Sequence, residues 1–137
     1  MLLELIAASS LSLNQWPKFR GPQENGHVAA KNIPEEWSDT KNVAWKVPVP
    51  GLGWSSPVLG DGKVYLTTAV KQGEGLTLRA MALDAATGKT VWDREVRKVD
   101  KAPSIHTKNS HASPTPILHE GSVFVHFGTL GTARLSD

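Results

Sequence analysis

The 137-residue chain contains no cysteine, which excludes disulfide bonds and metal sites built on thiolates. It also lacks any block of one charge, because 15 basic and 13 acidic residues are spread along the sequence and give a net charge of +2. This pattern offers no electrostatic basis for binding nucleic acid. No apolar run is long enough to cross a bilayer as a helix, so we expect no membrane span.

Two catalytic signatures are missing as well. The sequence has no Gly-x-Ser-x-Gly nucleophile elbow and no Gly-x-x-x-x-Gly-Lys-Ser/Thr phosphate loop. Their absence favours a chain without catalytic activity, but it does not decide the question.

What the chain does contain predicts an all-β fold. Nine prolines and twelve glycines separate short runs of β-favouring residues. Residues 76–82 alternate with a period of two, as expected of a strand with unlike faces. In the turn that follows, Asp84 and Thr87 can bond backbone amides and Gly88 can take a positive φ. Trp92 then lies in the returning strand and needs a neighbouring sheet to pack against.

The sequence also repeats a hairpin. Residues 56–67 match residues 115–126 at a fixed offset of 59, and both copies contain a proline, an acidic-Gly turn and an aromatic residue. Trp45 precedes Trp92 by 47 residues, and we interpret the two as equivalent positions of successive modules. A repeat on this scale predicts stacked sheet modules.

The eleven residues 82–92, Ala-Leu-Asp-Ala-Ala-Thr-Gly-Lys-Thr-Val-Trp, resemble the repeat signature of the PQQ-like β-propeller family of quinoprotein-type propellers. Further resemblance to exported members of that family lies in residues 16–22, 42–48, 54–58 and 109–116. The resemblance implies a partial β-propeller of four-stranded antiparallel blades, with about two blades present. A closed propeller takes about four to eight blades of roughly 40–50 residues, so we expect a fragment, unless copies assemble into a ring.

The expected organisation places Trp45 in the last strand of an incomplete blade and Trp92 in a complete one. In chain order it comprises a possible truncated signal peptide or tail (1–15), an irregular arm pinned by Trp16, Phe19 and Trp37 (16–42), a strand completing a last blade (43–50), a complete blade (51–96), an inserted loop (97–111) and the start of a truncated blade (112–137). The apolar start and the family resemblance together predict a periplasmic or secreted protein.

A candidate binding face combines two segments that lead into successive blades. It consists of Trp54, Ser55, Ser56, His106, Asn109, Ser110 and His111. An exposed Trp beside hydroxyls suits sugar stacking or a partner chain, and it suits packing between blades equally well. The histidines could equally be solvated loop residues bonded to neighbouring serines. Histidines 106, 111, 119 and 126 are not expected to converge, so no metal site is predicted. Asp84, Thr87, Gly88, Trp45 and Trp92 are expected to be structural.

The resemblance leaves three functions open. The first is a non-catalytic, protein-binding or assembly scaffold similar to the outer-membrane assembly lipoprotein, with no cofactor and with protein partners or the remaining blades as its contacts. The second is a fragment of a PQQ-dependent quinoprotein dehydrogenase, whose PQQ and calcium ligands would lie in missing blades. Such enzymes commonly use a vicinal cysteine pair, which this chain lacks. The third is a sugar-binding propeller that uses Trp54.

Overall fold

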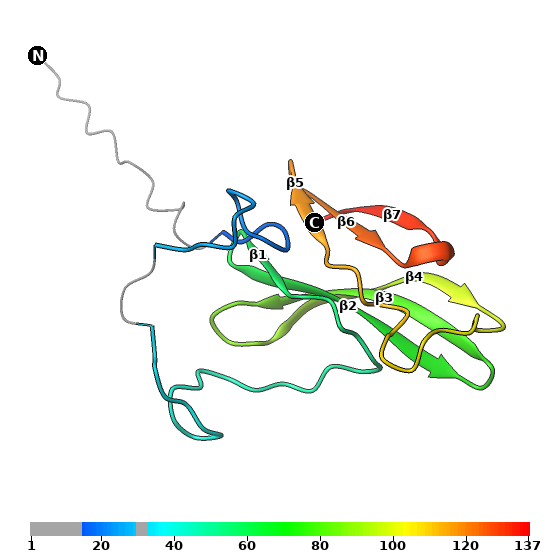
Figure 1. The fold of residues 1–137 in the computed structure, drawn as a ribbon, viewed down its shortest axis with the longest axis horizontal. Coiled ribbons are helices and arrows are strands. Elements are labelled where there is room, and N and C mark those ends of the chain that lie inside the picture. The colour runs from blue at the N-terminus through cyan, green and yellow to red at the C-terminus, as the bar shows by residue number, and fades with distance from the viewer. Residues whose placement is uncertain (1–14, 30–32) are drawn as a thin grey trace, which may run out of the picture.

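The computed structural model describes residues 15–29 and 33–137, and these residues form two antiparallel sheets (Figure 1). The first sheet has the order β1-β2-β3-β4 and the second the order β5-β6-β7. Their bounds are β1 Val58–Gly60, β2 Lys63–Gln72, β3 Gly75–Asp84, β4 Thr90–Val99, β5 Ile117–His119, β6 Ser122–His126 and β7 Thr132–Ser136. The all-β fold class is thus confirmed, as one four-stranded sheet and part of a second in a partial β-propeller.

The two hairpins of the internal repeat have the same turn geometry. Asp61 and Gly62 join β1 to β2 with φ values of 50° and 73°. Glu120 and Gly121 join β5 to β6 with φ values of 47° and 66°. Positive φ at both central residues is typical of the two-residue turn whose twist matches paired antiparallel strands. The repeat predicted from the sequence is therefore a structural repeat.

The turn between β3 and β4 is built as the sequence predicts. The Asp84 carboxylate accepts hydrogen bonds from the Thr87 amide at 2.8 Å and the Thr87 hydroxyl at 2.7 Å. These bonds, that of the hydroxyl first, lower the pKa of Asp84. Gly88 has a φ of 72°, and its amide donates to the Asp84 carbonyl. Asp84, Thr87 and Gly88 thus have a structural role.

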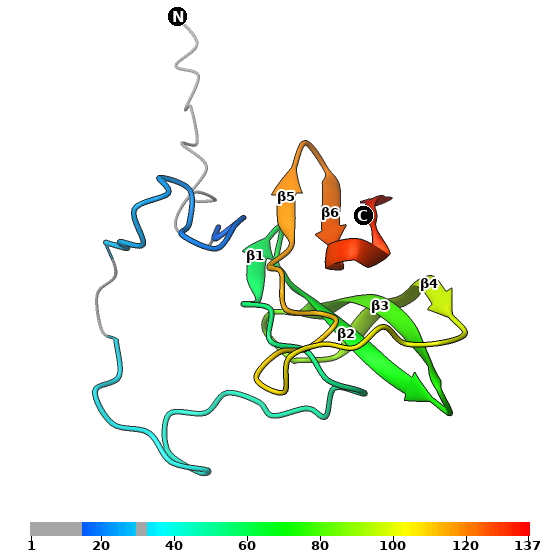
Figure 2. The same ribbon diagram turned by 45° about the vertical axis from the view of Figure 1, so that its right-hand side comes forward.

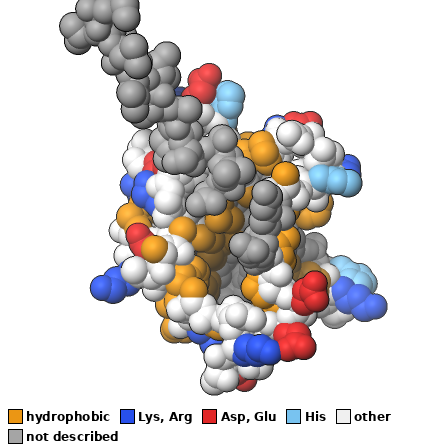
Figure 3. All heavy atoms as spheres, turned by 90° about the vertical axis from the view of Figure 1, so that its left-hand side faces the viewer, with side chains coloured by type: hydrophobic (Ala, Val, Ile, Leu, Met, Phe, Trp, Pro, Cys, Tyr) orange, Lys and Arg blue, Asp and Glu red, His pale blue; other side chains and the backbone are white. Residues whose placement is uncertain are grey.

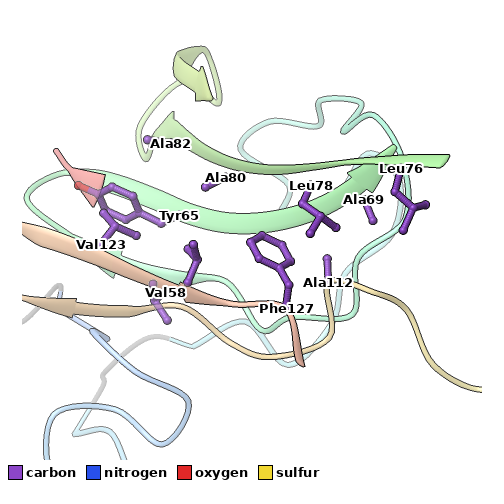
Figure 4. Close-up of a cluster of buried hydrophobic side chains, with 11 residues drawn as sticks. Val58, Tyr65, Ala69, Leu76, Leu78, Ala80, Ala82, Ala112, Val123 and Phe127 are labelled. Atoms are coloured by element: carbon purple, nitrogen blue, oxygen red, sulfur yellow. The ribbon is translucent and has the colours of Figure 1, made fainter. Parts of the chain in front are cut away.

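The core lies between the two sheets. Tyr65 and Leu78 of the first sheet, which are 2% and 0% exposed, point toward Val123 and Phe127 of the second (Figure 4). The smaller members of this cluster are Val58, Ala69, Ala80, Ala82, Ala112 and Val125. Strands β1 and β5 run close together at one side of this interface (Figure 2). A Cβ on Gly60 would lie 2.6 Å from Leu118 Cδ1, so a side chain at this position would displace the end of the Leu118 side chain.

The opposite face of the first sheet, here called its back face, is also covered. Trp45 Nε1 donates to the Ala85 carbonyl at 3.0 Å, and Thr68 Oγ1 donates to the Pro50 carbonyl at 2.5 Å. Residues 45–50 therefore lie across this face, and Met81 on it is 4% exposed. The expectation that β3 has unlike faces is wrong, because the second sheet covers one of its faces and residues 45–50 lie against the other.

Residues 43–50, which were expected to form a strand, form none. A strand requires a hydrogen-bonded neighbour, and no strand within residues 15–29 and 33–137 pairs with this segment. Its side chains still alternate in burial, since Trp45 and Val47 are half-buried and their neighbours are exposed. The expected loop 97–111 begins later, because β4 continues to Val99.

The N-terminal arm is attached mainly through Trp16 and Pro17. Trp16 exchanges backbone hydrogen bonds of 2.9 and 3.0 Å with Leu59, and the Pro17 carbonyl accepts one of 2.8 Å from Leu118. Leu59 and Leu118 are equivalent positions of the repeat. Phe19 and Trp37 were expected to pin the arm but are mostly exposed. From the side on which the arm lies, Figure 3 shows hydrophobic side chains gathered near the centre and charged ones toward the rim.

The predicted signal peptide or tail falls almost entirely on residues 1–14, outside the residues that the structure describes. Among the described residues, no helix is both long and apolar enough to traverse a membrane.

Candidate functional site

The two segments of the candidate binding face lie side by side. The amides of Trp54 and Ser55 both donate to the Ala112 carbonyl, at 3.1 and 3.2 Å. The amide of Ser56 donates to the Thr115 hydroxyl at 3.2 Å, and these two residues are equivalent in the repeat. The structure therefore brings the lead-in of the first sheet against the end of the long loop, as the sequence predicts.

A hydroxyl and amide network shapes the end of that loop. Asn109 Oδ1 accepts hydrogen bonds from the Ser110 amide at 2.9 Å and from the Ser113 hydroxyl at 2.5 Å. The Ser110 hydroxyl accepts from the Ala112 amide at 3.1 Å, and Ser110 is only 7% exposed. Ser110 therefore fixes the shape of the loop, whereas Asn109 is exposed.

Both loop histidines bond to backbone groups. His106 Nδ1 accepts from the Lys108 amide at 3.1 Å, which leaves its proton on Nε2 in the neutral ring. His111 Nε2 donates to the Pro103 carbonyl at 2.9 Å and so ties together the two ends of residues 103–111. The alternative of bonds to neighbouring serines is wrong for these contacts. His106 stays exposed and can contact a ligand.

His119 and His126 lie elsewhere. His119 is at the β5–β6 turn beside Glu120, and His126 Nδ1 shares a hydrogen bond of 2.8 Å with the Thr132 hydroxyl. Within residues 15–29 and 33–137, no three His, Cys, Asp or Glu side chains are grouped to hold a metal ion.

A pocket of about 420 Å³ opens beside the loop. Its walls are mainly apolar, and polar groups of the loop and of β2 stand around them. The lining residues are Gly51, Leu52, Ala69, Lys71, Leu76, Ala102, Ile105, Asn109, Ser110 and His111. Leu52 and Ile105 are 71% and 41% exposed, so the apolar walls reach solvent. An apolar hollow with a few polar groups at its margin is the usual form of a binding pocket.

Trp54 contributes a separate contact surface. Its side chain is 58% exposed although its amide is anchored to Ala112. Neighbouring Ser55 is used internally, since its hydroxyl accepts a hydrogen bond from the Thr67 amide at 3.3 Å. Of the candidates at residues 54–56, Trp54 is thus the one most free to contact another molecule.

A cluster around Asp137 between the two sheets escaped the sequence analysis. The carboxylate accepts hydrogen bonds from Tyr65 Oη at 2.8 Å and Trp92 Nε1 at 3.0 Å, and it pairs with Lys63. Burial raises the pKa of Asp137, but the bonds from Lys63, Trp92 and Tyr65 outweigh it and the net pKa is lowered. Burial, with Asp137 next in effect, raises the pKa of Tyr65. More than 70 residues separate Asp137 from Tyr65, so no local motif could have revealed the cluster.

Trp45 and Trp92 have matching structural roles. Trp92 lies 6.0 Å from Tyr65 between ring centroids, Arg94 lies 4.6 Å above its ring, and its Nε1 bonds Asp137 of the second sheet. Trp45 Nε1 bonds Ala85 of the first sheet. Ala85 and Asp137 occupy equivalent positions of the two sheets. Leu83 pairs with Val64 of β2, and Leu135 pairs with the equivalent Val123 of β6. Ala85 and Asp137 each lie two residues after these leucines.

No protein-family model matches the chain, and no curated protein matches it. The PQQ-like resemblance stays a prediction carried by the residues themselves. The structure defines an all-β repeat chain with an open, largely apolar pocket beside its longest connection.

Proposed function

We propose that this chain is a non-catalytic PQQ-like β-propeller segment of an exported protein and acts as a protein-binding or assembly scaffold. The observation that carries the proposal is the pocket of about 420 Å³ whose exposed apolar walls, Leu52 and Ile105, stand beside Asn109 and His111. Protein interfaces combine such apolar anchors with a polar rim. The partner would insert an apolar side chain between Leu52 and Ile105.

The loop that forms one wall is held in place, which supports a binding role. His111 bonds Pro103, Asn109 and Ser113 bond each other, and the Ala102 amide donates to the Glu74 carbonyl at 2.8 Å. A loop fixed by its own hydrogen bonds loses little conformational entropy when a partner binds.

The test is photo-crosslinking from position 105 in the protein as expressed in its own cells. The cross-linked protein would be identified by mass spectrometry, purified and titrated with this chain. Ile105→Asp should weaken its binding at least about tenfold, because a charge would enter an apolar contact. Val91→Asp is the matched control, since Val91 is 50% exposed on β4 outside the pocket. Failure to find any protein whose binding depends on Ile105 would overturn the proposal.

A sugar-binding propeller is a second candidate, favoured by the 58% exposure of Trp54. Aromatic rings stack on the apolar faces of sugars. Glycan binding that is lost in Trp54→Ala and retained in Ile105→Asp would support it. The proposed export is tested separately, by fractionating cells that express the full-length protein and detecting it outside the cytoplasm.

A further inference from the structure

A lysine of β2 stands at the wall of the pocket of about 420 Å³. By the alternation of the strand, the side chain of Lys71 leaves the same face of the sheet as that of Ala69, which also lines the pocket. Its partner in the strand register is Leu76, a third lining residue. Lys71 is exposed, whereas Ala69 and Leu76 belong to the core. The ammonium group therefore stands at the end of an apolar row.

This lysine has no anionic partner among the described residues. Their ion pairs engage a different set of lysines, namely Lys18, Lys41, Lys46, Lys63 and Lys98. No acidic side chain of the described residues lines the pocket. Glu74 and Asp100 are the acidic residues nearest along the chain to lining residues, but neither lines the pocket or pairs with Lys71. A ligand can therefore meet the full positive charge of Lys71.

The other polar side chains of the pocket leave only donors to a ligand. Asn109 Oδ1 already accepts hydrogen bonds from the Ser110 amide and the Ser113 hydroxyl, so the Nδ2 group of Asn109 is the part that remains available. His111 Nε2 is engaged with the backbone of its own loop. The ammonium group of Lys71 and the amide of Asn109 both call for an acceptor, and a carboxylate is the acceptor that also matches the charge.

We propose that the pocket takes an apolar side chain together with a neighbouring acidic side chain of an extended segment of a partner protein. The apolar group fills the space between Leu52 and Ile105, and the carboxylate binds Lys71 and Asn109. This inference rests on the proposed function and specifies the chemistry of the partner. Charge complementarity is its basis, because a basic residue in the same place would bring two cations together beside apolar walls.

A second hollow favours an extended segment over a compact small molecule. It has a volume of about 190 Å³ and reaches Phe127 and Leu130. Ile105, Asn109 and His111 line both hollows, so the two adjoin along the loop. A single small carboxylic acid would occupy only one of them. A segment that crosses the loop at Ile105 can place one side chain in each hollow.

The test is a peptide selection on the purified full-length protein. Random peptides displayed at the N-terminus of a phage coat protein are selected on the wild type, and clones that also bind Ile105→Asp are discarded. Peptides displayed in this way have no free C-terminal carboxylate, so only an acidic side chain can bind Lys71. The retained peptides should carry an Asp or Glu close in sequence to a large apolar residue.

A charge exchange then tests the contact itself, with affinities measured by fluorescence anisotropy. Lys71→Glu should weaken the binding of a retained peptide at least about tenfold, because like charges then face each other. Replacing the acidic residue of the peptide by lysine should restore binding to Lys71→Glu, which a misfolded variant could not show. Lys71→Met keeps the apolar stem and should weaken binding about threefold or more. Lys89→Glu changes an exposed lysine outside the pocket and is the matched control, which should bind like the wild type.

Two results would overturn this inference and leave the proposed function standing. Retained peptides could lack acidic residues, or they could bind Lys71→Glu as tightly as the wild type, although Ile105 would still be required. A selection that yields no peptide dependent on Ile105 would also overturn the inference. The cross-linking experiment then decides the proposed function separately.

Discussion

The same hairpin occurs twice in this chain, and the two copies have opposite surroundings. Val58 is 0% exposed in the first sheet, whereas its equivalent Ile117 is 48% exposed in the second. Tyr65 is 2% exposed, whereas its equivalent Phe124 is half-buried. On the other face the order reverses, because Val123 is buried and its equivalent Val64 is half-buried. Equivalent residues therefore owe their burial to the neighbouring sheet and not to their own strand.

This comparison has an energetic consequence. Burying an apolar side chain stabilises the folded state by about 1.5–3 kcal/mol relative to leaving it exposed. Only the side chains on a covered face of a sheet are stabilised in this way. The first sheet has covering groups on both faces and should be the more stable unit. The second sheet depends on the first for its one covered face.

The largest difference in stability is expected when the same charge is placed at equivalent positions of the two hairpins. Val58→Asp should cost about 3–5 kcal/mol because it leaves an unpaired charge in the core. Ile117→Asp should cost less than about 1 kcal/mol of folding free energy, since its side chain reaches water. Urea unfolding at low micromolar concentration, followed by tryptophan fluorescence, measures both. Equal losses would show that the two faces are equally covered.

A second pair of variants tests the covering of the first sheet by Trp45. Gly88 has a φ of 72°, and a Cβ there would lie 2.5 Å from Trp45 Cε3. Gly62 has a φ of 73° and no atom within 4 Å of such a Cβ. Gly62→Ala should therefore cost about 1 kcal/mol for its backbone alone, and Gly88→Ala about 2–3 kcal/mol with the added clash. Equal costs in thermal unfolding would place Trp45 away from the turn.

A third, smaller effect concerns the aromatic pair. Tyr65→Phe removes the hydrogen bond to the Asp137 carboxylate and should cost about 1–2 kcal/mol. The reciprocal change, Phe124→Tyr, adds a hydroxyl on the open face and should alter stability by less than about 0.5 kcal/mol. Chemical denaturation of both variants provides the measurement. If Tyr65→Phe left the free energy of unfolding unchanged, water would have replaced the hydroxyl at Asp137.

The last test is the pH dependence of the contact between the sheets. The pKa of Asp137 is lowered in the folded chain, so its stabilising contribution is present above the unfolded value of 3.8 and is lost as pH falls through the folded pKa. The difference in unfolding free energy between wild type and Asp137→Asn should therefore be largest near neutral pH and shrink below about pH 4. Urea titrations at pH 7, 4 and 2.5 measure it. A difference that does not change with pH would assign the role of Asp137 to shape alone.

The local sequence was enough to predict the turns and the strand pairs that they connect. The acidic-Gly pairs predict the β1–β2 and β5–β6 hairpins because few other residues accept two consecutive positive φ values. Asp84, Thr87 and Gly88 predict the β3–β4 turn for the same kind of local reason. The contact between residues 54–56 and the end of the long loop follows from the repeat, since both lead into equivalent strands.

The sequence did not predict features that depend on residues far away along the chain. Residues 43–50 have strand-like alternation but form no strand, because pairing requires a neighbour that alternation cannot supply. Phe19 and Trp37 are large aromatic residues that the sequence suggests as anchors, yet both are mostly exposed. Asp137 carries no local signal, although it joins Lys63, Tyr65 and Trp92 across the two sheets.

The sequence by itself determined the all-β class, the repeat and the geometry of its turns, since these follow from backbone preferences acting over a few residues. Tertiary structure decided which of two equivalent faces is buried, where Trp45 docks and how the long loop forms a pocket with β2 and β3. Burial and long-range hydrogen bonds depend on what lies opposite a strand, and an identical local pattern can therefore meet a packed sheet in one copy and water in the other.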